Sequence, residues 1–199
     1  MGSTMSSITL NGDISGSAII TVPSVAGSPT LTLPTTSGTI ITTGTTQANL
    51  PANIAGNGPS FSAYFNGSLT MTSAYTYYKM TCETEQWDTN SNYDNSTNYR
   101  FTPTVAGYYQ VNGGVSITST NTAASALYKN GSLYCVGNPA TNASLGRIPS
   151  TISIIVYMNG TTDYVELWGQ SPSAGQVIAA YSIDNKLSTY FQAALIRGA

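Results

Sequence analysis

A regular alternation of apolar and polar residues marks residues 107–118 as a strand with one buried face. Proline fixes φ and glycine tolerates positive φ, so Pro103 and Gly107 predict a turn that folds the segment ending near Phe101 back onto this strand. We place this strand at the centre of the predicted fold. Its predicted buried face carries Tyr109, Val111, Gly113, Val115 and Ile117.

Short strand-like segments recur after residue 59, separated by turns rich in glycine, asparagine and proline. The strongest local signal is the Asn130-Gly131 pair, which predicts a two-residue hairpin turn. The polar run at residues 87–98 predicts a loop. No helical period is sustained, so the pattern predicts an all-β fold, an antiparallel sandwich of two sheets. The other predicted strands cover residues 61–65, 70–85, 151–157, 163–168 and 187–196.

Residues 1–58 differ from the rest, because they contain no aromatic residue and only one charge, Asp13. Such a segment lacks the large apolar side chains that a core of its own would need. Its many β-branched residues favour extended chain, and residues 15–21 are echoed imperfectly at residues 37–42. The composition predicts two parts: an extended arm or stalk, residues 1–58, and a folded domain, residues 59–199. A flexible linker is the alternative for the first part.

The composition narrows the function classes. Charged residues make up 7% of the chain, against roughly 25% in ordinary domains, which favours a fixed assembly. Six scattered basic residues and a net charge of -2 argue against nucleic-acid binding. Histidine is absent, which lowers the expectation of catalysis, and two cysteines favour buried thiols over one disulfide. No apolar run is long enough to span a membrane and no signal peptide is recognisable, so we expect no membrane insertion and synthesis in a cytoplasm.

Five segments of residues 59–199 carry a resemblance in their order and spacing. They are the aromatic strand at 61–65, Phe101-Thr-Pro with Ala106-Gly-Tyr-Tyr, the hairpin at 127–131, the strand-turn-strand at 153–167, and the closing strand at 188–196. Together they resemble the jelly roll of complement globular heads and tumour-necrosis-factor-like (TNF-like) proteins. The resemblance implies a homotrimeric knob, usually on a stalk. This chain has Gly160-Thr-Thr where that family usually has Gly-Asp, so no ion-binding role is carried over to Asp163.

The predicted closing strand is apolar on both faces, so a second surface must cover its outer side. A symmetric trimer would do so. The sequence leaves open which of Tyr190 and Phe191 faces the core and which faces a neighbouring subunit. The residues predicted to lie in the trimer interface or in the core are Tyr109, Ile155, Tyr157, Tyr190, Phe191 and Leu195.

The loop at residues 87–99 is the candidate ligand-facing segment, because tyrosine and asparagine suit sugars and cell-surface polymers. Framework contacts are the alternative for the same residues. The acidic residues at 83, 85, 88 and 94 lack calcium-loop spacing, so we expect a solvated loop and no metal, cofactor or catalytic residue. The candidate ligand-facing residues are Trp87, Asn92, Tyr93 and Asp94.

These features predict a structural protein of a bacteriophage virion: a head or tail fibre, or a capsid decoration. Residues 31–44 resemble Thr/Leu/Pro/Gly-rich segments of phage tail-fibre and other virion proteins. Residues 1–58 would bind capsid or tail proteins, and the trimeric knob would lie on the virion surface, with host polysaccharide as a candidate ligand. The alternatives are a secreted lectin-like module and a polysaccharide depolymerase that uses the acidic residues.

Overall fold

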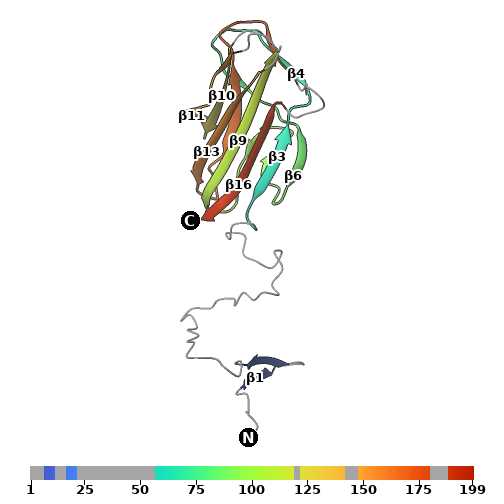
Figure 1. The fold of residues 1–199 in the computed structure, drawn as a ribbon, viewed down its shortest axis with the longest axis vertical. Helices are drawn as coiled ribbons and strands as arrows, with labels where there is room; N and C mark the ends of the chain where they lie inside the picture. The colour runs from blue at the N-terminus through green and yellow to red at the C-terminus, as the bar shows by residue number, and fades with distance from the viewer. Residues whose placement is uncertain (1–6, 12–16, 22–56, 119–121, 142–147, 180–187) are drawn as a thin grey trace. The chain divides into compact units, whose positions relative to one another are not determined.

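The computed structural model describes residues 7–11, 17–21, 57–118, 122–141, 148–179 and 188–199, and every regular element in these ranges is a strand (Figure 1). The chain divides into two compact units, residues 1–42 and 43–199. The composition change at residue 58 lies inside the second unit, just before its first strand.

The first unit contains one antiparallel pair, β1 (Ser7–Asn11) and β2 (Ser17–Thr21). Its register places Ile8 opposite Ile20 and Leu10 opposite Ala18. The segment at residues 37–42 that echoes β2 lies outside the described residues.

The second unit is a sandwich of two antiparallel sheets, each of seven strands. We call the first the front sheet, because it faces the viewer in Figure 1. The front sheet contains β13 (Ile148–Met158), β9 (Gly107–Thr118), β16 (Tyr190–Gly198), β3 (Ser60–Tyr64) and β6 (Thr84–Asp88), with β15 (Gln176–Ala179) and β4 (Ser68–Met71) at one end. The back sheet contains β11 (Ser132–Val136), β10 (Thr122–Lys129), β14 (Val165–Gln170), β8 (Arg100–Phe101) and β7 (Tyr93–Asp94), with β5 (Tyr78–Lys79) on β14 and β12 (Ala140–Thr141) on β10. The predicted all-β, two-sheet fold class is confirmed.

Strand β9 is the central element, as predicted, because it pairs with β13 along one edge and with β16 along the other. The five residues predicted on its inner face are all buried. On β16 the inner face is Phe191, Ala193 and Leu195. Phe191 therefore belongs to the core, which settles the choice between it and Tyr190.

The core between the sheets is aromatic near β3. Phe61 stacks on Tyr93 with ring centroids 4.3 Å apart and on Phe101 at 4.7 Å, and it meets Phe191 edge to face at 5.1 Å. The buried Tyr93 hydroxyl donates to the Cys82 carbonyl, 3.0 Å away, so its polar end is satisfied. Both cysteines are free thiols; Cys82 is buried, as predicted, whereas Cys135 is half-buried.

Two local predictions need correction, and one strand of the front sheet has an exposed face. The run at 70–85 contains parts of three strands, β4, β5 and β6, because turns interrupt it. Residues 87–98 are not all loop. Trp87 and Asp88 are the last two residues of β6, and β7 lies within the same polar stretch. In the single chain, β13 is covered on one face only, since Ile155 and Tyr157 are exposed.

Candidate functional site

The outer face of the front sheet carries exposed apolar side chains from four strands. Ile155 is 54% exposed and Tyr157 44% on β13, and Tyr108 of β9 stands beside Tyr157 with ring centroids 5.5 Å apart. Ile196 of β16 and Trp87 of β6 are also exposed. Large apolar side chains gathered on one sheet face indicate a surface that binds another protein.

A row of uncharged polar side chains crosses the middle of this face. The Ser153 hydroxyl donates to Asn112 Oδ1, 2.9 Å away, and Gln110 donates to both residues, at 3.0 and 3.1 Å. Farther along the row, Gln192 donates to the Ser62 hydroxyl at 3.1 Å, and that hydroxyl donates to Gln86 at 2.8 Å. These bonds use part of the hydrogen-bonding capacity of the row, which lowers the desolvation cost of covering it with protein.

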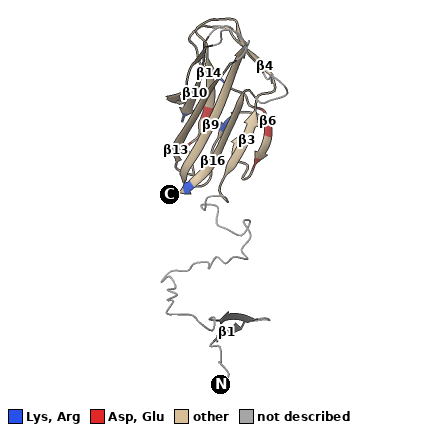
Figure 2. Ribbon diagram, in the orientation of Figure 1, with Lys and Arg blue, Asp and Glu red and all other residues tan. Residues whose placement is uncertain are grey.

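Charge is nearly absent from the same face. Figure 2 shows no charged residue on β13, β9 or β3, one at the end of β16 and the acidic residues on β6. A face with so few charges has little electrostatic repulsion toward another copy of the chain.

The β11 edge of the back sheet is a second apolar surface. Leu133, Tyr134 and Val136 are each about half exposed, and β11 pairs only with β10 among the described strands. An unprotected edge strand with apolar side chains offers both hydrogen-bonding groups and hydrophobic area to a partner.

The six predicted interface or core residues separate into two sets. Tyr109, Phe191 and Leu195 are buried in the core. Ile155 and Tyr157 are exposed on the outer face, and the half-buried Tyr190 lies over Gly114, where an added Cβ would come within 2.6 Å of the tyrosine ring. Only this second set is available to another chain.

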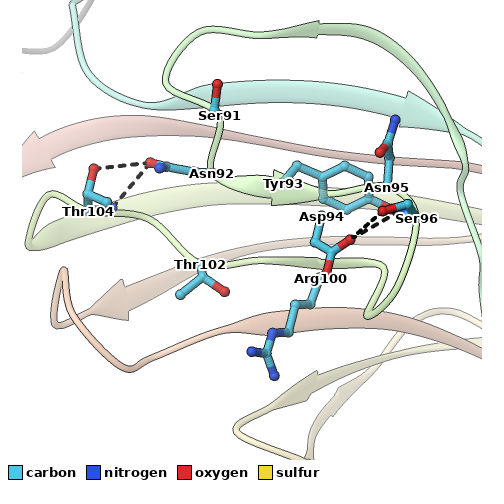
Figure 3. Close-up of a pocket in the computed structure, with 9 residues that line it drawn as sticks. All are labelled: Ser91, Asn92, Tyr93, Asp94, Asn95, Ser96, Arg100, Thr102 and Thr104. Atoms are coloured by element: carbon cyan, nitrogen blue, oxygen red, sulfur yellow. Dashed lines mark hydrogen bonds between the residues drawn. The ribbon is translucent and has the colours of Figure 1, made fainter.

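A polar pocket lies beside β7 and β8, with a volume of about 530 Å³ (Figure 3). Figure 3 shows Asn92, Asp94, Arg100, Thr102 and Thr104 around an open hollow. The remaining lining residues are Ser91, Tyr93, Asn95 and Ser96.

Buried hydrogen bonds fix the frame of this pocket. Asn92 is 8% exposed; its Oδ1 accepts from the Thr104 N–H at 3.2 Å, and its carbonyl accepts from the Thr102 N–H at 2.8 Å. Ser91, shortly before β7, and Tyr99, directly before β8, both have left-handed backbones, with φ of 53° and 49°. Positive φ is costly for such residues, so the surrounding hydrogen bonds must hold this shape.

Asp94 holds the turn that follows β7. Its carboxylate accepts backbone N–H groups from Ser96, Thr97 and Asn98 at 2.9–3.1 Å, and the Asn98 amide at 2.7 Å. The hydrogen bond from the Thr97 N–H is the largest cause that lowers the pKa of Asp94; burial opposes it, but the hydrogen bonds from Ser96 and Asn98 also lower the pKa. Asp94 is therefore ionised at neutral pH, but its oxygens are occupied by the chain.

The candidate ligand-facing residues fall in different places. Asn92, Tyr93 and Asp94 line the pocket, although Tyr93 is buried beneath it. Trp87 lies on β6, opposite Ser62, and does not line this pocket. Sequence reasoning missed Arg100, Thr102 and Thr104, which reach the pocket through the pairing of β8 with β7 and carry no motif.

Comparison with solved structures identifies the fold. Murine APRIL has a TM-score of 0.51 and 6% identity over 69% of this chain and 98% of its own, and Eiger TNF from S. frugiperda has 0.52 and 8% over 70% and 93%. The fold is a TNF-like jelly roll. PRD1 vertex protein P5 has the same fold, with a TM-score of 0.50 and 17% identity over 70% of this chain and 97% of its own. No family model matches, and no curated protein is similar in sequence.

In this TNF-like jelly roll, Asp163 has a structural place. It pairs with Lys129 at 3.0 Å and accepts from the Asn130 side chain at 2.8 Å, which joins the β10–β11 turn to the β13–β14 turn. Burial tends to raise the pKa of Asp163, but hydrogen bonds from Asn130 and Lys129 outweigh it and lower the pKa. The Asp163 carboxylate is therefore bound by side chains of the same protein, Lys129 and Asn130.

The acidic residues of the jelly roll serve its loops in the same way. Glu83 accepts the Asn66 N–H at 2.9 Å, and Asp88 accepts the Tyr93 N–H at 2.7 Å. Within the described ranges, no three His, Cys, Asp or Glu residues group as metal ligands would, and no helix is long and apolar enough to span a membrane.

Proposed function

We propose that this chain is a structural protein of a bacteriophage particle. Three copies of the jelly roll form an exposed knob, and residues 1–58 attach the knob to capsid or tail proteins. The observation that carries the proposal is the presence of two unlike apolar surfaces on one jelly roll, the charge-poor outer face of the front sheet and the β11 edge.

Two unlike surfaces favour a ring. If the β11 edge of one copy packs on the outer face of the next, the contact is head to tail, and such contacts close into a ring when the rotation permits. The resemblance to trimeric jelly rolls sets the expected number at three. Each Ile or Tyr side chain that becomes fully buried on assembly would then contribute up to about 1.5–3 kcal/mol to the free energy of assembly.

Attachment to a particle is supported by the likeness to PRD1 vertex protein P5 and by the composition of residues 1–58. The only described structure in the first unit is a two-stranded sheet, which is marginally stable by itself. Pairing with particle proteins would supply what it lacks. The proposed role is structural and adhesive, at the virion surface, and requires no catalytic step.

Light scattering on residues 1–199 tests the assembly. We expect a mass three times 20.8 kDa, and Ile155→Asp is expected to reduce it to one copy because it places a charge in the interface. Tyr75→Asp is the matched control, since Tyr75 is 73% exposed and belongs to neither surface, and it should leave the mass unchanged. A single-copy or two-copy wild type would overturn the trimer.

Sedimentation with assembled particles tests the attachment. The whole chain is expected to sediment with particles, and a chain lacking residues 1–58 is expected to stay in the supernatant. Equal recovery of both chains in the pellet would contradict the role of the arm.

A further inference from the structure

The pocket beside β7 and β8 contains polar groups that the chain itself does not use. No hydrogen bond or ion pair joins the Arg100 side chain to another described residue, whereas Lys79 and Lys129 each pair with a carboxylate. The Arg100 guanidinium lies over the Tyr164 ring, 4.4 Å from its centroid. This stacking positions a planar group whose N–H donors remain free.

Two hydroxyls lie in the same pocket without a partner among the described side chains, those of Thr102 and Ser91. The Asn95 amide donates to the Glu83 carbonyl, which leaves its oxygen as an acceptor. Donors and acceptors are therefore mixed around a hollow whose backbone is already held by Asn92 and Asp94. A preorganised site of this kind loses little entropy when a ligand binds.

The charges of the lining decide the class of ligand. Arg100 and Asp94 are the only charged residues that line the pocket, and they balance. An anion would meet the ionised Asp94, and a cation would meet Arg100. Tyr93 offers no free ring face, because it is buried against Phe61. A neutral ligand with many hydroxyls, which both donate and accept, fits these groups through hydrogen bonds at its edges.

We propose that this pocket binds a neutral sugar unit of a surface polysaccharide, with Arg100 and Thr102 as the residues that recognise it. The inference rests on the proposed function, since it supplies the ligand class for a knob exposed on a particle. The sequence suggested Trp87 and Tyr93 among the ligand-facing residues. The proposed recognition residues lie instead on β8 (Arg100) and just after it (Thr102).

Calorimetric titration of residues 1–199 tests the site with neutral oligosaccharides of glucose, galactose, mannose and N-acetylglucosamine, and with oligogalacturonate as the anionic comparator. We expect saturable binding of at least one neutral probe and none of oligogalacturonate. Arg100→Gln is expected to weaken binding about tenfold or more and Thr102→Val about fivefold. Thr70→Val, on exposed β4, is the matched control and should bind as the wild type does.

Salt dependence separates the neutral ligand from an anionic one. Affinity should be the same at about 50 mM and about 500 mM NaCl, because no net charge is neutralised on binding. The assignment fails if no neutral probe binds, if Arg100→Gln binds normally while folded, or if salt abolishes binding. Mass and particle sedimentation are read separately: a trimer that sediments with particles but binds no neutral probe overturns the pocket and leaves the proposed function intact.

Discussion

At the scale of single residues, Asp94 shows how a carboxylate can organise a loop. Its hydrogen bonds to three consecutive backbone N–H groups lower its pKa. Asp94→Asn keeps the size but has one oxygen and no charge, so we expect it to reduce the free energy of unfolding at pH 7 by about 1 kcal/mol. Thermal unfolding should then occur about 2–4 °C lower.

The pH dependence of this loss follows from the sign of the shift. A pKa lowered in the folded state gives stability above the unfolded value of about 3.9, and that stability is lost as the pH falls through the folded pKa. The difference in unfolding free energy between wild type and Asp94→Asn should therefore be constant above about pH 5. It should narrow progressively as the pH falls below about 4. Melting curves across this range measure it, and a gap that widens in acid would contradict the role of the carboxylate.

At the scale of elements, the turn between β10 and β11 is tied to the turn after β13 by one side chain. Asn130 has φ of 53°, accepts from the Tyr164 N–H at 2.9 Å and donates to Asp163 at 2.8 Å. Asn130→Ala should lower the free energy of unfolding by about 2–3 kcal/mol, because it loses these bonds and strains the backbone.

Asn130→Gly separates the two causes. Glycine accepts positive φ without strain, so only the hydrogen bonds are lost and the expected cost is about 1–2 kcal/mol. Urea unfolding of the two variants provides the comparison. If glycine were as destabilising as alanine, backbone strain would have no part in the effect.

Elements that the sequence predicted well are those that local pattern determines. The alternation in β9 follows from one buried sheet face, and Asn130-Gly131 forms its turn within two residues. By contrast, β7 and β8 have two residues each. They form only through tertiary pairing, because β7 pairs with β8 and β8 pairs with β14. Arg100 joins Tyr164 and the pocket only through that pairing, so no local pattern marked it.

At the scale of the whole molecule, the jelly roll buries its core completely but leaves large apolar side chains exposed on its outer face. Phe61, Phe101 and Tyr109 are fully buried inside one chain, whereas Ile155 and Tyr157 remain about half exposed outside it. The core is compatible with a folded single copy. Covering the outer face in the proposed trimer would add stability that the single copy lacks, so the proposed trimer should have a thermodynamic signature.

Assembly should make the unfolding temperature depend on concentration. A trimer that unfolds to three chains is stabilised by mass action, so raising the protein concentration about a hundredfold should raise the unfolding temperature by several degrees. Ile155→Asp, which is expected to be monomeric, should unfold at one temperature throughout, and Tyr75→Asp should follow the wild type. Calorimetry at the two ends of the range measures the slope. A wild type without any slope would contradict assembly of this chain with itself, because dissociation would then have no part in unfolding.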